Sequence, residues 1–199
     1  MNLQTNGSKI GVAHVKELIL ISGIPGSGKS TLAKALAERI NCNVMSVSET
    51  VRKEKLYLEI EKDECGEEVY VVDMDSLQKK VENLEGCWII EGVVVDFVPP
   101  ERVRKVLYLQ ADVNTLISRM KEKGYCKKKI CSNLEAELVG SYYYILKDIY
   151  GDKVTCVSTN SPLEKSLDQA LEALKCKHFP YSLHTEDEWK LFFQECPLQ

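Results

Sequence analysis

The sequence of 199 residues lacks the long apolar runs that mark membrane proteins and secreted precursors. No run approaches the roughly 20 apolar residues needed to span a bilayer. The segment of residues 1–16 lacks the apolar core of a secretory signal. We therefore expect a protein that is neither membrane-bound nor secreted.

A basic excess is also missing. The chain has 26 lysines and arginines against 30 aspartates and glutamates, a formal net charge of -4. Proteins that coat nucleic acids neutralise backbone phosphates with an excess of basic side chains. Bulk nucleic-acid binding is therefore not expected, and any contact with RNA would have to be local.

Cysteine is plentiful, with eight residues, but no two of them form a C-x-x-C pair. Cys126 and Cys131 would supply only two ligands to a four-ligand zinc site, and no second pair is evident. In a chain without a secretory signal, the pattern favours reduced thiols that serve as small apolar side chains. Neither disulfides nor zinc is expected.

Short apolar runs alternate with longer helical patterns, and neither an internal repeat nor a Gly/Ser linker interrupts them. Runs of this kind are typical of buried parallel strands joined by right-handed crossover helices. The expected fold is a three-layer α/β domain over residues 17–175, with extensions at 1–16 and 176–199. The five expected strands are 18–21, 42–46, 87–92, 105–110 and 154–158.

The stretch "GIPGSGKST" at 23–31 follows the first strand and opens a helix. Its pattern, G-x-x-x-x-G-K-[ST], is the phosphate-binding loop, in which backbone N-H groups and a helix N-terminus converge on phosphates. Lys29 would reach the outer phosphates, and the Ser30 hydroxyl would bind Mg²⁺. The motif predicts a bound nucleotide, but it does not identify the acceptor.

Other users of this loop fit the chain less well. A hexameric ATPase module needs a longer chain and an apolar strand that ends in adjacent acidic residues, and neither is visible. A GTPase would carry an N-K-x-D motif to read the base, and the chain has none. A small phosphoryl-transfer kinase remains.

Three further features suit such a kinase. Arg52, on an expected short helix, could hold the phosphate of an acceptor, since two anions must be brought into line. Glu91 ends an apolar strand and could hold Mg²⁺ through water, with Asp96 as the alternative. A run of basic residues around Gly124 is typical of a mobile lid over ATP, although a solvated face would look similar.

Near the C-terminus, a loop containing Thr159, Asn160 and Pro162 could press against the adenine, or Pro162 could simply start a helix. Thr185 is a predicted N-cap of an amphipathic helix that packs back on the domain. The three histidines, His14, His178 and His184, fall in the terminal extensions, and we assign them no catalytic role.

These stretches together resemble the adenylate kinase isoenzyme 6 family, whose eukaryotic members also act as ribosome-assembly ATPases and which has archaeal relatives. The similarity runs from about residue 17 to 175. Besides the loop, it rests on "VSETVRKEKLY", "IIEGVVVDF", "PPERV", "RMKEKGYCKKKICSNLEAE" and "VSTNSPLE". The resemblance implies a P-loop kinase fold with a parallel sheet of order 2-3-1-4-5, helices on both faces and a short lid.

The resemblance also implies reversible phosphoryl transfer between ATP and AMP, with a monophosphate-binding region near 46–80 and a lid near 119–131. It assigns catalysis to Lys29, Arg119 and Lys123, AMP binding to Arg52 and Glu91, and Mg²⁺ to Ser30 and Glu91. The implied ATP-binding residues are Gly23, Pro25, Gly26, Ser27, Gly28, Lys29, Ser30, Thr31, Arg119 and Asn160. Two positions depart from the family, which has a histidine at the position of Val93 and an arginine at that of Lys123.

Three functional hypotheses follow. The first is an Mg²⁺-dependent adenylate kinase. The second is an ATP-driven assembly factor that binds a basic small-subunit ribosomal protein during pre-rRNA maturation, in the nucleus or cytoplasm of a eukaryote or the cytoplasm of an archaeon. The third is a P-loop kinase for another small acceptor.

Overall fold

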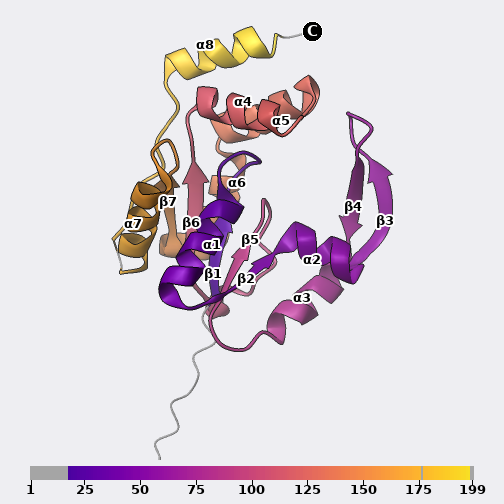
Figure 1. Ribbon diagram of the computed structural model, residues 1–199, viewed down its shortest axis with the longest axis vertical. Coiled ribbons are helices and arrows are strands. Elements are labelled where there is room, and N and C mark those ends of the chain that lie inside the picture. The colour runs from indigo at the N-terminus through magenta and orange to yellow at the C-terminus, as the bar shows by residue number, and fades with distance from the viewer. Residues whose placement is uncertain (1–17, 176, 198–199) are drawn as a thin grey trace, which may run out of the picture.

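The computed structural model describes residues 18–175 and 177–197 as an α/β sandwich with a separate hairpin and a cap of helices (Figure 1). The N-terminal extension at 1–16 and Cys176 lie outside the described residues. The strands are β1 (Leu18–Ser22), β2 (Asn43–Ser46), β3 (Tyr57–Lys62), β4 (Glu68–Val72), β5 (Trp88–Glu91), β6 (Val103–Gln110) and β7 (Val154–Ser158). The α-helices are α1 (Lys29–Ile40), α2 (Val47–Glu54), α3 (Met74–Glu82), α4 (Val113–Glu122), α5 (Lys127–Leu138), α6 (Ser141–Tyr150), α7 (Leu163–Leu174) and α8 (Glu186–Glu195).

The central sheet is five-stranded and parallel, in the order β2-β5-β1-β6-β7. The five strands predicted from the sequence are all present. With the hairpin strands β3 and β4 left out of the count, the order is 2-3-1-4-5, so the predicted topology is confirmed. β1 lies at the centre of the sheet, and all five of its residues are buried, as a strand covered on both faces requires.

Successive residues of β1 point to opposite faces and so supply two separate cores. Leu18 and Leu20 pack with side chains of α3 and α6 on one face. Ile19 and Ile21 pack with α1 and α7 on the other face. A third apolar cluster joins α4, α5 and α8 above the carboxyl ends of the strands, and it includes Phe192 of α8.

One part of the fold goes beyond the sequence prediction. Within the predicted monophosphate-binding region, β3 and β4 pair as an antiparallel hairpin, which the sequence analysis missed. Its turn is set by the Asp63 carboxylate, which accepts hydrogen bonds from the backbone N-H groups of Cys65 (2.9 Å) and Glu67 (2.9 Å). At the C-terminus, the helix predicted from Thr185 is confirmed: α8 begins with a Thr185 capping box and packs on α4 and α5 through Phe192.

The expectation of reduced cysteines was wrong. Three disulfides form, Cys42–Cys87, Cys65–Cys126 and Cys131–Cys196, with Cα atoms 4.9, 6.1 and 5.6 Å apart. Buried Cys156 is the free cysteine among the described residues. The paired cysteines lie 45 to 65 residues apart in sequence, and only the folded chain brings them close enough to bond.

Candidate active site

The phosphate-binding loop connects β1 to α1 at the carboxyl edge of the sheet. Gly23 has φ +145°, and a Cβ there would stand 2.7 Å from the Ser27 Oγ and 2.8 Å from the Leu109 carbonyl oxygen. Gly28 caps α1 in the left-handed region, with φ +91°. Only glycine meets both conditions, so the loop can wrap tightly and direct its N-H groups inward.

Lys29, the first residue of α1, is folded back on its own loop. Its Nζ donates hydrogen bonds to the carbonyl oxygens of Gly23 (2.8 Å) and Ile24 (2.9 Å). Burial, helped by the positive charge of Lys123, lowers the pKa of Lys29 to about 8, against the opposing effect of Glu91 and Glu137. An ammonium held this way is poorly solvated and would gain from an arriving phosphate.

Beside Lys29, the Ser30 Oγ donates a hydrogen bond of 3.1 Å to Glu91 Oε1. Glu91 is the last residue of β5, pairs with Ile21 of β1, and is only 5% exposed. A hydroxyl and a carboxylate are the hard oxygen donors that Mg²⁺ takes. The pair therefore fits the predicted Mg²⁺ site, whereas Asp96, the alternative, is exposed beyond the strand end.

Arg119, in the last turn of α4, closes the other side of the loop. Its guanidinium donates to the Gly26 carbonyl (3.2 Å), the Thr159 carbonyl (2.8 Å) and the Thr159 Oγ1 (3.3 Å). It therefore ties the phosphate-binding loop to the loop that follows β7. This placement joins two segments that are 133 residues apart in sequence, from Gly26 to Thr159.

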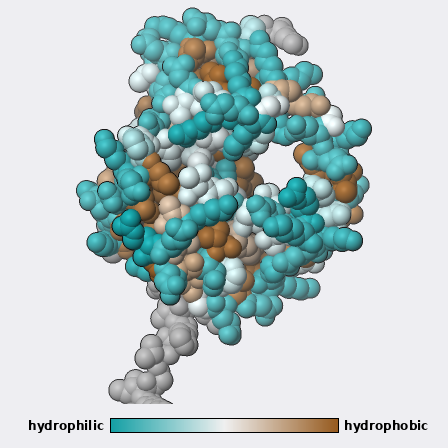
Figure 2. All heavy atoms as spheres, in the orientation of Figure 1, coloured by the Kyte–Doolittle hydropathy of each residue, from teal (hydrophilic) through white to brown (hydrophobic). Residues whose placement is uncertain are grey.

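Two cavities meet at the phosphate-binding loop, and Gly26, Gly28, Thr31 and Lys123 line both of them. The larger, about 800 Å³, is also lined by Glu91 and by residues of α2 and β4. The smaller, about 480 Å³, lies between the loop, Arg119 and Thr159. Figure 2 shows the larger side as a hollow between the hairpin and the body of the molecule.

Only some of the other predicted site residues line the two cavities. Pro25 and Ser30 line the larger cavity, while the buried Ser27 Oγ has no hydrogen-bond partner among the described residues. Arg52 is on a short helix, α2, as expected, but it is exposed and does not line either cavity. Asn160 accepts a hydrogen bond from the Asp112 N-H (2.8 Å) and lies outside the smaller cavity.

Sequence reasoning missed several residues of the larger cavity. Tyr70 of the hairpin and Tyr125, between α4 and α5, line it together with six valines. Val69, Tyr70 and Val72 were missed because the hairpin itself was not foreseen. Tyr125 and Val93 lay in stretches that carry the family resemblance, but neither was assigned to a binding site. The valines are Val47, Val51, Val69, Val72, Val93 and Val94.

A buried polar cluster next to α5 was also missed. The Tyr108 hydroxyl donates to Glu137 Oε2 (2.7 Å), and His184 Nε2 lies 3.8 Å from Glu137 Oε1. His184 Nδ1 is 3.0 Å from Glu188. Despite its burial, the neighbouring carboxylates of Glu137 and Glu188 raise the pKa of His184. Nothing in the sequence around His184 indicates that this residue of the C-terminal extension would contact Glu137 of α5.

Known proteins resemble this chain in sequence and in fold. Residues 19–140 match the family described as "AAA domain". A Methanocaldococcus jannaschii protein named "Putative adenylate kinase" is 31% identical over 80% of this chain and 86% of its own length. A Plasmodium falciparum protein named "Adenylate kinase isoenzyme 6 homolog" is 32% identical over 60% of this chain and 73% of its own.

The chain belongs to the adenylate kinase family of P-loop proteins. The family resemblance drawn from the sequence motifs is thereby confirmed.

Solved structures support the fold of this adenylate kinase family member. A shikimate kinase from Bacteroides thetaiotaomicron superposes with a TM-score of 0.53, 16% identity, and coverage of 80% of this chain and 98% of the other. A gluconokinase from Sinorhizobium meliloti gives a TM-score of 0.50, 17% identity, and coverage of 91% and 98%. Among the described residues, no helix is both long and apolar enough to cross a membrane.

Proposed function

We propose that the protein catalyses Mg²⁺-dependent, reversible phosphoryl transfer from ATP to AMP. The observation that carries this proposal is the pair of cavities that share one phosphate-binding loop. A donor in the smaller cavity and an acceptor in the larger one would meet phosphate to phosphate beside Lys29. Bringing two anions into line is the main task of a nucleotide kinase.

The smaller cavity suits ATP. Its walls combine the loop, the Arg119 guanidinium and the loop after β7, where Thr159 and Ser161 line it. Arg119 already makes three hydrogen bonds there, so its charge is held in position and needs little reorganisation when a polyphosphate arrives. On ATP binding, we expect Lys29 to exchange its two backbone carbonyls for phosphate oxygens.

The larger cavity suits a nucleoside monophosphate better than a sugar acid or another small polar acceptor. Its six valines and two tyrosines offer apolar and aromatic surface, on which a base can stack. Ser48 and Glu68 add polar groups to the wall. Arg52 lies next to Val51 on α2, and we keep it as the proposed partner of the acceptor phosphate.

Ser30 and Glu91 would hold Mg²⁺ through their oxygens or through water. When bound, the ion would neutralise charge on the transferring phosphoryl group. Within the part of the chain that the structure describes, these two side chains are the oxygen donors in contact here, so we expect the phosphates and water to complete the coordination. We infer Mg²⁺ from the chemistry of these donors and from the family.

The family's second role, as an assembly ATPase, requires activation of water. Val93 lines the larger cavity, and its carbonyl accepts a hydrogen bond from the Ser22 Oγ (2.7 Å). Its apolar side chain can neither orient a water molecule nor take a proton from one. We therefore expect ATP hydrolysis without an acceptor to be slow beside transfer to AMP. A ribosomal role is tested by a pull-down with small-subunit ribosomal proteins, and failure to retain any of them in a nucleotide-dependent way would count against it.

The test offers purified protein ATP and Mg²⁺ with AMP, with CMP, with other monophosphates, and with no acceptor. ADP that forms only with AMP supports the proposal. Lys29→Ala should abolish this activity, whereas Lys34→Ala, a change of an exposed lysine on the same helix, should leave it intact. Absence of AMP-dependent ADP formation by the unaltered protein would refute the proposal.

A further inference from the structure

The tip of the β3–β4 hairpin reaches across the larger cavity to the segment between α4 and α5. In Figure 2 the hairpin and the body frame an open window that is closed at one end by this contact. Figure 1 shows that the hairpin is otherwise held to the body only at its base, near α2 and α3. The two walls of the cavity therefore belong to parts of the molecule that meet again only at the hairpin tip.

Ion pairs hold the tip. Lys129 in the first turn of α5 contacts Asp63 Oδ2 (2.8 Å) and Glu67 Oε2 (2.7 Å), on either side of the turn. The Ser132 hydroxyl donates to Glu64 Oε1 (3.1 Å). The Lys129 ammonium also lies 4.9 Å from the centre of the Tyr125 ring, a wall of the larger cavity. The contact is thus continuous with the proposed acceptor site.

A disulfide crosses the same gap. Cys65 is in the hairpin turn, and Cys126 is the N-cap of α5. Both residues are partly accessible to solvent, in contrast to the buried thiol of Cys156. A small dithiol or thiol can therefore reach this bond. Lys127 and Lys128 are exposed beside it and would attract an anionic disulfide such as that of glutathione.

The position of the bond determines what it controls. Glu68, Val69 and Tyr70, which follow Cys65 on the hairpin, line one wall of the larger cavity. Lys123 and Tyr125, which precede Cys126, line the opposite wall. A nucleotide that enters or leaves between these walls needs them to separate, as in other enzymes that close over their substrates. A covalent bond between the walls prevents that separation.

We propose that Cys65 and Cys126 form a thiol–disulfide switch that locks the proposed acceptor cavity when oxidised and lets it open when reduced. The expected effect on turnover rests on the proposed kinase function, but the expected effect on opening of the hairpin does not. The ion pairs of Lys129 keep the hairpin tip near α5 in the reduced protein. Cys65 and Cys126 therefore stay close together, and the bond can form again at little cost in chain entropy.

The chemistry balances with glutathione disulfide as the oxidant. One cysteine thiolate attacks a sulfur of glutathione disulfide, forming a mixed disulfide and releasing one glutathione thiolate. The second cysteine thiolate then attacks the protein sulfur of the mixed disulfide and releases the second glutathione thiolate. Two electrons pass from the two cysteine sulfurs to the oxidant, and the two cysteine protons are taken up by the released thiolates or by water.

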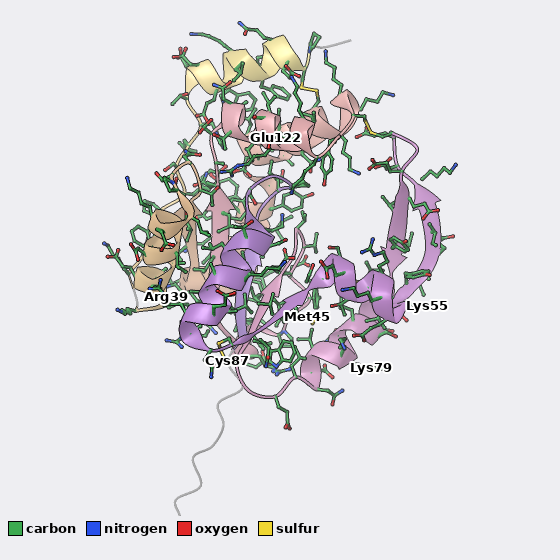
Figure 3. The ribbon with its side chains drawn as sticks, viewed as in Figure 1. Arg39, Met45, Lys55, Lys79, Cys87 and Glu122 are labelled. Carbon is green, nitrogen blue, oxygen red and sulfur yellow. A yellow bond between two sulfur atoms is a disulfide. The ribbon has the colours of Figure 1, made fainter. Side chains whose placement is uncertain are left out.

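The chain offers a matched control. Cys42 and Cys87 each precede a strand by one residue, and β2 and β5 are neighbours in the sheet. Figure 3, where Cys87 is labelled, shows this pair at the foot of the body, away from the hairpin tip. Neither Cys42 nor Cys87 lines the larger cavity, so we expect reduction of this bond to leave both cavity walls in place. Removal of the Cys42–Cys87 bond therefore tests whether an effect of oxidation comes from the Cys65–Cys126 bond or from any disulfide in the protein.

The experiment equilibrates the full chain with defined ratios of reduced and oxidised glutathione and maps the disulfides by differential alkylation. Hydrogen exchange of residues 57–72 reports opening of the hairpin, and ADP formation from ATP and AMP reports turnover. We expect oxidation to slow hairpin exchange and to lower turnover at least about tenfold, with full recovery on reduction. Cys65→Ser should remove both responses, and the double change Cys42→Ser with Cys87→Ser should keep them.

Lys129→Ala provides a second variant that keeps both cysteines. In the reduced protein it should speed hairpin exchange, because the ion pairs at the tip are lost. The proposal is overturned if the bond fails to form at any glutathione ratio, or if a mapped bond changes neither exchange nor turnover. A redox response in exchange without any AMP-dependent activity would sink the kinase proposal and leave the switch standing.

Discussion

The depressed pKa of Lys29 makes ATP affinity depend on pH in a way that can be worked out in advance. Burial and the charge of Lys123 lower this pKa to about 8 in the free protein. A bound polyphosphate surrounds the same nitrogen with negative charge and favours its protonated form. The ammonium must therefore be present in the complex, although it is lost from the free protein above about pH 8.

The size of the effect follows from these two states. At about pH 7 the free protein already carries the charged lysine, so raising the pH from about 6 to about 7 should change affinity little. At about pH 9 roughly nine-tenths of the free protein has a neutral Lys29, and affinity should fall about tenfold. By linkage, ATP binding should take up close to one proton at about pH 9 and almost none at about pH 7.

Calorimetric titration of the unaltered protein with ATP and Mg²⁺, in two buffers of different ionisation enthalpy at each pH, measures both quantities. Lys29→Arg is the matched control, since a guanidinium stays charged throughout this range. Its affinity, whatever its absolute value, should be nearly constant between about pH 7 and about pH 9. An unaltered protein with flat affinity and no proton uptake, or an arginine variant with the same tenfold fall, would refute the reasoning.

Three further changes have expected outcomes. Arg119→Ala removes three hydrogen bonds to the loops around the smaller cavity, and it should raise the KM for ATP about 10- to 100-fold while affecting the KM for AMP less, as steady-state kinetics would show. Glu91→Gln should lower the apparent affinity for Mg²⁺, measured as a metal titration of turnover that shifts to higher Mg²⁺ concentration. His184→Ala should destabilise the fold by about 3 kcal/mol in urea at about pH 6. The loss should shrink as pH rises through the raised pKa of His184, where the unaltered protein loses the same ion pair, and exposed His178→Ala should cost little at any pH.

The sheet and the phosphate-binding loop could be predicted because their signals are local. Runs such as "LILI" are apolar on both faces, which only a covered parallel strand tolerates, and β1 is buried throughout. Gly23 occupies a space that a Cβ would fill, and Gly28 has a left-handed backbone conformation that other residues rarely adopt. Strand order followed from family resemblance, and the structure has that order.

The hairpin and the disulfides could not be predicted from the same kind of signal. β3 is almost wholly exposed and half of its six residues are charged, which does not mark it as a strand. β4 does have a strand-like composition, Glu-Val-Tyr-Val-Val, which the sequence analysis overlooked, but nothing in it indicates that its partner is β3. Cysteine pairing depends on which segments lie side by side, and Cys65 meets Cys126 only because the hairpin tip reaches α5. The expectation of reduced thiols was therefore outweighed by tertiary proximity.

The contacts of α5 indicate which wall of the larger cavity moves. Its C-terminal half is fixed to the body, because the buried Glu137 accepts a hydrogen bond from Tyr108 of β6 at its side chain and from Tyr181 at its backbone carbonyl. A disulfide between Cys131 and Cys196 ties the same helix to the end of α8. Among the residues that the structure describes, the hairpin is anchored to the body only at its tip and its base. Opening of the acceptor cavity should therefore carry β3 and β4 away from a stationary α5, which is the motion that the Cys65–Cys126 bond would forbid.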